Sequence, residues 1–205
     1  MIPIGGFQEF SLQDYPGEIA SIIFTQGCNW ACPWCHNKSL WSKQVDPEKQ
    51  SYFEQKVNEF MRQDKINHVV VTGGEPTIWG SKLVEFLEEL KAANKKIKLD
   101  TNGSIPPVLR DIILHRTNLI DFIAMDIKAN WNITEYTKAS GIYFFDNNMG
   151  DITSSIHLIK RKSKVPYHFR VTLHPGITEE MLGNIYKDYS LTKEEVILQE
   201  YKEIK

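Results

Sequence analysis

The sequence has few cysteines, and their placement is more informative than their number. Cys28, Cys32 and Cys35 lie within eight residues, and the rest of the 205-residue chain has none. Without a distant partner they cannot form a disulfide framework. No apolar run reaches the roughly 18 residues of a transmembrane helix, and the N-terminus lacks the basic and apolar segments of a signal peptide. We therefore expect a cytoplasmic protein, with no membrane partner, whose clustered thiols bind metal or do redox chemistry.

An excess of positive charge is also absent. The chain has 24 basic and 26 acidic side chains, a net charge of −2, which argues against a nucleic-acid partner. Hydrophobic residues make up 41% and charged residues 24%, the composition of an ordered globular protein rather than a disordered one. The length suits one domain, so residues 1–205 are expected to form a single unit with its own core.

Short apolar strands alternate with amphipathic helices along the chain, which is typical of a parallel α/β fold. The periodicity predicts strands at 19–25, 68–72, 96–101, 119–128, 167–174 and 195–201, and helices at 47–63, 81–93, 107–115, 152–162 and 179–189. The stretch 129–150 is interpreted as an irregular functional loop. Six strand–helix units, the last without its helix, predict a partial (β/α)6 barrel that is open on one side.

Chemically distinctive residues follow the predicted strands, where the loops of such folds carry function. They are Cys28, Cys32 and Cys35 after the first strand, Gly73, Gly74 and Glu75 after the second, Asp100 at the end of the third, Asp126 and Lys128 at the end of the fourth, and Arg170 on the fifth. Five independent loops are therefore expected to meet at one rim.

The spacing Cys28-x3-Cys32-x2-Cys35 supplies three soft thiolate ligands. A [4Fe–4S] cluster normally takes four cysteines, so three would leave one iron open to an outside ligand. One alternative is a zinc site with His36 as the fourth ligand, although adjacent Cys35 and His36 would point at one ion with difficulty. Another is three inert buried thiols. The clustering favours the iron–sulfur interpretation.

This cysteine pattern, with the aromatic Trp34 before the last cysteine, resembles the radical S-adenosylmethionine (SAM) family, whose members have a full or partial barrel. The resemblance implies that the open iron binds the amino and carboxylate groups of SAM. It further implies that the reduced cluster cleaves SAM to methionine and a 5′-deoxyadenosyl radical, which abstracts a hydrogen atom from substrate. The protein would position the reactants and exclude water.

The resemblance also implies roles for neighbouring residues. Gly73, Gly74 and Glu75 look like the family motif that holds the methionine amino group; alone, such a motif could be an ordinary turn. An acid at the position of Asp100 would contact ligand or a nearby monovalent cation. His36 would contact adenine through its backbone.

Trp34 would pack beside the cluster or adenine, and a simple hydrophobic plug is an alternative. Asp126 and Lys128 share a strand face, so they either meet a ligand or form an interior ion pair. Their segment resembles glycyl-radical activases, in which such residues lie near SAM and the substrate peptide. Arg170 lies on the polar face of an alternating strand and could bind the SAM carboxylate; a solvated strand face is the alternative.

Residues 6–17, 24–28, 98–103 and 125–128 are similar to the anaerobic ribonucleoside-triphosphate reductase activating proteins. This implies a glycyl radical enzyme as protein substrate and a reductant such as flavodoxin or ferredoxin. The absence of further cysteines excludes classes with auxiliary clusters. Two alternatives remain: a single-cluster enzyme acting on a small molecule, similar to 7-carboxy-7-deazaguanine synthase, which usually has an altered cysteine loop, and a zinc-binding interaction module.

Overall fold

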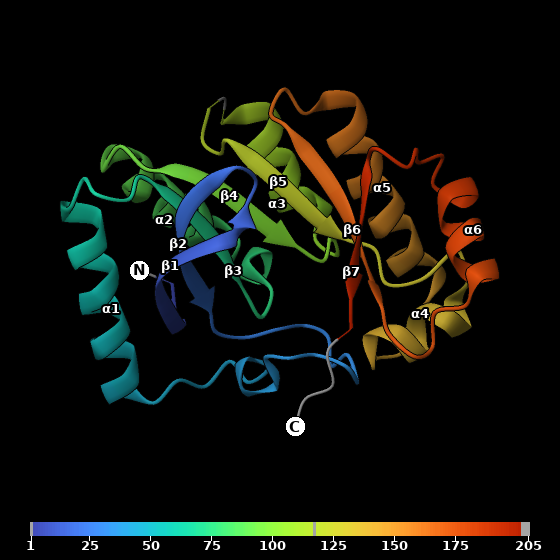
Figure 1. Cartoon of the computed structure of the whole chain (residues 1–205). Coiled ribbons are helices and arrows are strands. Elements are labelled where there is room, and N and C mark those ends of the chain that lie inside the picture. The colour runs from blue at the N-terminus through green and yellow to red at the C-terminus, as the bar shows by residue number, and fades with distance from the viewer. Residues whose placement is uncertain (1, 117, 202–205) are drawn as a thin grey trace.

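The computed structural model describes residues 2–116 and 118–201, and its centre is one seven-stranded sheet (Figure 1). The strands follow one another in sequence order across the sheet. They are β1 (Ile4–Tyr15), β2 (Glu18–Thr25), β3 (His68–Gly73), β4 (Lys96–Thr101), β5 (Phe122–Asp126), β6 (Tyr167–Leu173) and β7 (Val196–Glu200). Strands β2 to β7 pair in parallel, and β1 pairs antiparallel with β2. The curled sheet is a half-barrel, which confirms the predicted partial barrel.

Helices join the parallel strands, as right-handed crossovers require. They are α1 (Pro47–Arg62), α2 (Ser81–Ala92), α3 (Pro106–Arg110), α4 (Ile133–Ser140), α5 (Asp146–Lys162) and α6 (Glu179–Asp188), with short helical turns η1 (Lys38–Leu40), η2 (Pro76–Trp79) and η3 (Asp111–His115). Helix α1 begins where its sequence indicates, because Asp46 accepts bonds from two first-turn amides and Pro47 follows it.

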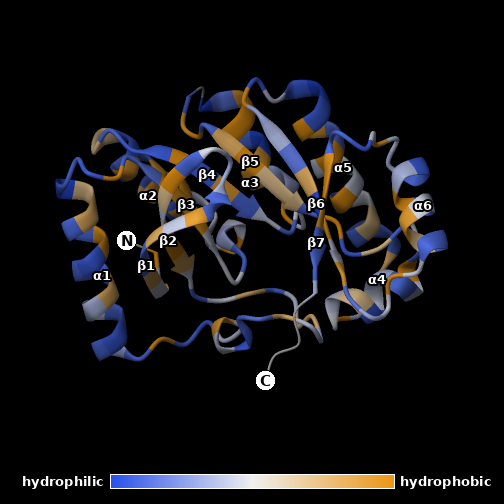
Figure 2. Cartoon of the chain, viewed as in Figure 1, coloured by the Kyte–Doolittle hydropathy of each residue, from blue (hydrophilic) through white to orange (hydrophobic). Residues whose placement is uncertain are grey.

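The main core lies between the helices and the outer face of the sheet, where Figure 2 shows apolar residues along both. Strand residues that alternate along the chain enter it, such as Val69 and Val71 on β3 and Ile97 and Leu99 on β4. The opposite face of the same strands therefore faces the barrel interior.

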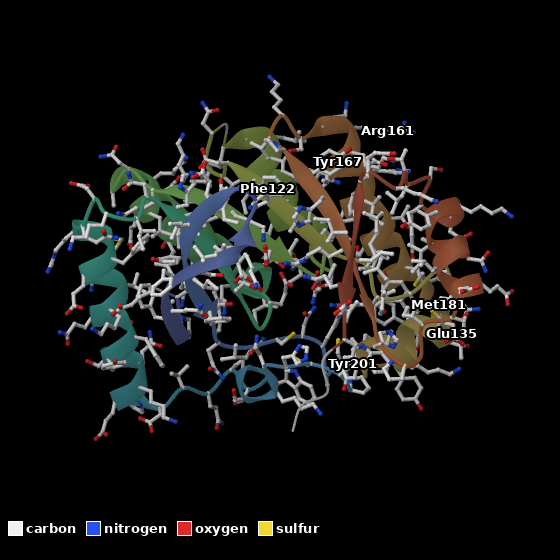
Figure 3. All side chains as sticks on the ribbon, viewed as in Figure 1. Phe122, Glu135, Arg161, Tyr167, Met181 and Tyr201 are labelled. Atoms are coloured by element: carbon white, nitrogen blue, oxygen red, sulfur yellow. The ribbon has the colours of Figure 1, made fainter. Side chains whose placement is uncertain are left out.

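A smaller apolar cluster fills the inner face near the start of the strands. It consists of Tyr15, Ala20, Ile22 and Val70, with Phe122 packed against it. Tyr15 comes from the end of β1, and its ring centroid lies 6.2 Å from that of Phe122 (the latter labelled in Figure 3). The β1–β2 hairpin thus covers the end of the barrel opposite the strand carboxyl ends.

The six parallel strands lie where the sequence predicts them, whereas the structure differs from the sequence analysis at three other places. Strand β1 was not predicted, because residues 4–15 carry glycines and polar residues that break the alternation. The stretch 129–150 is not an irregular loop: it contains α4, capped by Asn132 and ended by Gly141 at φ +70°, and the start of α5. The helix predicted at 107–115 is divided into α3 and the π-helical turn η3.

Candidate active site

A cavity of about 310 Å³ opens at the carboxyl ends of the parallel strands. Its size is within the range of small-molecule sites. All the site residues predicted from the sequence line it: Cys28, Cys32, Trp34, Cys35, His36, Gly73, Gly74, Glu75, Asp100, Asp126, Lys128 and Arg170. Residues from five separate segments therefore meet in one place, as the parallel topology predicts.

The cysteine loop after β2 is held by backbone bonds to distant segments. The amides of Gly27 and Cys28 donate to the carbonyls of Leu40 and Trp41, at 2.8 and 3.1 Å. The amide of Ala31 donates to the carbonyl of Ser140 at the end of α4, at 2.8 Å. The loop is consequently fixed at both of its sides, and the α4 segment misread as a loop is one of its supports.

The three thiols are partly buried and free. The Trp30 amide donates to Cys28 Sγ and the Asn37 amide to Cys35 Sγ, each at 3.3 Å. Burial raises the pKa of the Cys28 thiol to about 12, so this sulfur needs a cation or metal to remain a thiolate. Amide donors aimed at sulfur and a bordering cavity fit a cluster held by three cysteines.

A mononuclear site fits less well. Among the described residues, no group of three or more His, Cys, Asp or Glu side chains gathers in a way that could hold a single metal ion. In this arrangement Cys28, Cys32, Cys35 and His36 do not converge as the four ligands of the alternative zinc site would. In a cubane each thiolate binds a different iron, so its ligands need not meet at one point.

The two glycines at the end of β3, Gly73 and Gly74, let this strand end pack against the base of the cysteine loop. A Cβ on Gly74 would lie 2.0 Å from the carbonyl oxygen of Gly27, and one on Gly73, at φ +124°, 2.3 Å from the amide nitrogen of Thr25. The amides of Gly74 and Glu75 donate to the carbonyls of Thr25 and Gly27. Only glycine fits this approach.

Glu75 is buried, with 1% of its surface exposed. Its carboxylate accepts bonds from the Thr77 amide and hydroxyl, the Thr101 hydroxyl and the Asn102 amide, at 2.6 to 3.1 Å. Burial raises the pKa of Glu75, and these donors oppose that rise. The side chain therefore joins the end of β3 to the end of β4, and its acceptor positions are largely used within the protein.

Five charged side chains form an alternating string across β4, β5 and β6. Lys98 contacts Asp100 at 2.5 Å, Asp100 contacts Arg170 at 2.7 Å, Arg170 contacts Asp126 at 2.6 Å, and Asp126 contacts Lys128 at 2.9 Å. Three cations and two anions give the string a net charge of +1 (3 − 2). The structure shows the interior ion pair of Asp126 and Lys128. Both residues also line the cavity, and their contact with a ligand stays a prediction.

The string fixes the charge states of its members. Burial acts to raise the pKa of Asp126, but Arg170 and Lys128 outweigh it and hold that pKa well below its usual range. Burial lowers the pKa of Lys98, and Asp100 opposes this only in part. Beneath the string, burial together with Lys98 and Arg170 lowers the pKa of His168 to about 4. His168 is therefore neutral at pH 7.

Trp34 stacks on His174, with ring centroids 3.5 Å apart and planes 15° from parallel. This contact packs the cysteine loop against the segment that follows β6. The His36 ring lies 6.0 Å from that of Tyr201, just beyond β7, in the region labelled in Figure 3. Both predicted aromatic residues consequently link the cysteine loop to the last part of the sheet.

Sequence reasoning missed three residues that support the site. Lys98 is 2% exposed and holds Asp100 from below, while Thr101 and Asn102 hold Glu75. Lys98 had a visible signal, since it lies two residues before Asp100 on the same strand face, the spacing that identified Asp126 and Lys128. Thr101 and Asn102 had no such signal, because their sequence is typical of a turn and does not indicate contact with Glu75.

These features define a class of protein. A model of the radical SAM superfamily matches residues 22–189, which is most of the chain, and the protein belongs to this superfamily. The matched segment contains the cysteine loop and every other predicted site residue.

Particular relatives are similar over part of their length. A Methanocaldococcus jannaschii protein that carries the name of a glycyl-radical enzyme activating enzyme is 32% identical over 63% of this chain and 51% of its own. The pyruvate formate-lyase-activating enzyme of Staphylococcus epidermidis is 28% identical over 82% and 66%. The 7-carboxy-7-deazaguanine synthase of Hyperthermus butylicus is 32% identical over 50% and 42%. The chain thus spans about two fifths to two thirds of the length of these relatives.

Solved structures agree on the fold. A structure of TYW1 with a lysine–pyruvate adduct superposes with a TM-score of 0.60 and 16% identity, covering 90% of this chain and 65% of TYW1. Within residues 2–116 and 118–201, no helix is both long and apolar enough to cross a membrane.

Proposed function

We propose that this protein is a radical SAM enzyme of the glycyl-radical-activating type, and that residues 1–205 act as a single radical SAM domain. The observation that carries the proposal is the cavity in which three cysteines, the Gly73–Glu75 turn and the charged string meet. When bound and reduced, a [4Fe–4S] cluster supplies the electron that cleaves SAM into methionine and a 5′-deoxyadenosyl radical, which takes a hydrogen atom from substrate. Cys28, Cys32 and Cys35 would hold this cluster.

The side chains around the cavity suit the polar groups of SAM. Lys128 and Arg170 belong to a string with one net positive charge, so they would attract the methionine carboxylate. Glu75 already accepts four bonds, so we assign it the task of holding the turn. The backbone of Gly73 and Gly74 would then face the methionine amino group.

The adenine side of SAM would meet Trp34 and the backbone of His36, which border the same cavity. The carboxylate of Asp100 already contacts two side-chain cations, Lys98 and Arg170. A monovalent cation bound at Asp100 would be a third cation beside this carboxylate.

For the partner, we propose a glycyl radical enzyme such as anaerobic ribonucleotide reductase, with flavodoxin or ferredoxin as reductant. The similarity to named activating enzymes supports this assignment. The similarity to a 7-carboxy-7-deazaguanine synthase supports a small-molecule substrate as the second candidate, although the standard Cys-x3-Cys-x2-Cys spacing favours the first.

The test combines the anaerobically reconstituted, reduced protein with SAM and a purified anaerobic ribonucleotide reductase. We expect 5′-deoxyadenosine by chromatography and a glycyl radical doublet by electron paramagnetic resonance. Cys32→Ala should lower the yields of both products at least a hundredfold. Lys43→Ala, on the same loop but outside the cavity, should leave both yields unchanged.

The outcomes separate the two parts of the proposal. If wild-type protein forms no more 5′-deoxyadenosine than Cys32→Ala, the radical SAM activity is wrong. If it cleaves SAM but forms no glycyl radical on any glycyl radical enzyme tested, the partner is wrong and the small-molecule candidate takes its place.

A further inference from the structure

Strand β7 is one edge of the half-barrel, because it ends the strand order and pairs only with β6 among the described strands (Figure 1). The register places Val171 beside Leu198 and Thr172 beside Gln199. A strand edge presents a row of backbone donors and acceptors that can pair with another extended chain.

The direction of each backbone group on β7 follows from one bond. The Phe169 amide donates to the carbonyl of Glu195 at 2.8 Å, so the polar groups of residue 195 point at β6. Backbone groups alternate in direction along a strand, so residue 197 also pairs with β6. The amides and carbonyls of Val196, Leu198 and Glu200 consequently point away from the sheet.

Several of the devices that usually protect an exposed strand are absent from this edge, which is short and ends in the charged Glu200. Its sequence, Val196 to Glu200, contains no proline, lysine or glycine, and no bulge interrupts its register with β6. Ile197 and Leu198 are exposed by 44% and 43%. An apolar, regular and open edge is a site where a partner strand gains hydrogen bonds and apolar contact together.

The same strand leads directly into the active site. Gln199 and Glu200 line the cavity that contains the three cysteines. Neighbouring strands lie about 5 Å apart, so a segment paired with β7 would pass the cavity mouth at roughly that distance from these two residues.

We propose that β7 is the docking edge for the protein substrate, which adds to it as an extended strand and so carries its glycine to the cavity mouth. This inference rests on the proposed function, because its occupant is the glycine-containing segment of a glycyl radical enzyme. Glycine has no side chain to fill a pocket, so the enzyme must select its Cα by the backbone on either side. Strand pairing presents that backbone, because main-chain hydrogen bonds supply the affinity and the alternating side chains on either side of the glycine set the register.

The test removes one outward-facing amide. In Leu198→Pro the donor that points away from β6 is lost, whereas the bonds of residue 197 to β6 remain, and proline is tolerated at such an edge position. Leu198→Val keeps the amide and is the matched control. Leu198 shares the face of Val171, which belongs to the core on the helix side, so neither change enters the cavity.

With reconstituted protein, SAM and anaerobic ribonucleotide reductase, we expect Leu198→Pro to lower the glycyl radical yield at least tenfold. Its SAM cleavage without the partner should stay within twofold of wild type, and Leu198→Val should match wild type in both assays. Amide exchange of the wild-type protein provides a second measurement: the Leu198 amide should slow when the partner is added.

Each contrary result has a distinct meaning. Equal radical yields in Leu198→Pro and wild type would overturn the docking edge. If Leu198→Pro lost its cluster or its SAM cleavage, amide exchange of the wild-type protein would decide. An exchange rate of the Leu198 amide that the partner leaves unchanged would overturn the docking edge. A shift from dimer to monomer in Leu198→Pro would assign the edge to a second copy of the chain instead. Wild-type protein that cleaves SAM but activates no glycyl radical enzyme would overturn the partner assignment and this inference with it.

Discussion

Arg170 on β6 donates from Nε to Oδ1 of Asp126 on β5 at 2.6 Å, and its Nη1 also reaches Asp100 on β4. Removing the guanidinium would leave two carboxylates facing one another in a largely buried position. We expect Arg170→Ala to lower the free energy of unfolding by about 3–5 kcal/mol, the usual cost of leaving a buried charge without its partner. Urea denaturation under anaerobic conditions measures this.

Arg170→Lys provides the control, because it keeps the charge but cannot bridge both carboxylates with a planar fork. Its loss of stability should be smaller than that of Arg170→Ala. An exposed ion pair contributes at most about 1 kcal/mol to stability. If the unfolding free energy of Arg170→Ala lies within that range of the wild-type value, the bridge between the two carboxylates does not stabilise the fold more than a surface ion pair.

The parallel half-barrel could be predicted because its signals are local. Apolar β-branched runs such as Val69 to Val71 identify buried strands without knowledge of their neighbours. Strand β1 and helix α4 could not be predicted in this way. Their residues are largely polar, and they form because β1 pairs with β2 and because Tyr136 of α4 is buried against Trp30 of the cysteine loop. Such contacts between distant segments have no counterpart in local periodicity.

The candidate site shows the same division. The cysteine spacing and the strand ends sufficed to identify twelve of the lining residues, because parallel topology brings all strand ends to one rim. The contacts between the lining residues could not be predicted from the sequence. No sequence pattern indicates that Glu75 binds Thr101 and Asn102, or that Arg170 joins two carboxylates on two other strands, since these depend on the curvature of the sheet.

Lys98 extends the charged string beneath the cavity, and its contribution can be measured separately. Lys98→Met keeps most of the side-chain volume but removes the charge beside Asp100. We expect a loss of about 1–3 kcal/mol in unfolding free energy, because the buried carboxylate loses one of its two partners. In the double variant with Asp100→Asn the two effects should not add, with a coupling of at least about 0.5 kcal/mol.

Lys96→Met is the matched control for this measurement. Lys96 lies on the same strand, but 57% of its side chain is exposed, and its contact with Asp121 should be worth at most about 1 kcal/mol. Equal effects of Lys96→Met and Lys98→Met would show that the buried pair contributes no more than a surface one.

Gly74 holds the base of the cysteine loop by its lack of a side chain. In Gly74→Ala the new Cβ would lie 2.0 Å from a carbonyl oxygen of the backbone, so the loop itself would have to move. We expect at least a fivefold loss of iron and sulfide bound after anaerobic reconstitution. Gly150→Ala, in α5, meets nothing within 4 Å and should retain full cluster content, with stability raised by up to about 1 kcal/mol. Full iron content in Gly74→Ala would show that the close approach is not required.

His168 makes stability depend on pH in a direction that can be stated in advance. Burial, Lys98 and Arg170 lower its pKa from 6.5 to about 4 in the folded protein. Between these values the unfolded chain binds more protons than the folded one, so stability falls as pH falls, by up to about 1.4 kcal/mol per pH unit for this group. Above pH 6.5 His168 is largely neutral in both the folded and the unfolded chain, so it no longer makes stability depend on pH.

The variant that checks this is His168→Phe, which cannot take up a proton and keeps a ring against Phe122, whose centroid lies 5.0 Å away. Unfolding free energies are compared at pH 5 and pH 7 in urea. Wild type should lose about 1–2 kcal/mol more than His168→Phe over this interval. Since His174 has a pKa lowered to about 4 by its own burial, some pH dependence should persist in His168→Phe and become smaller in the double variant. Identical slopes for wild type and His168→Phe would show that His168 accepts a proton as readily in the folded protein as in the unfolded chain.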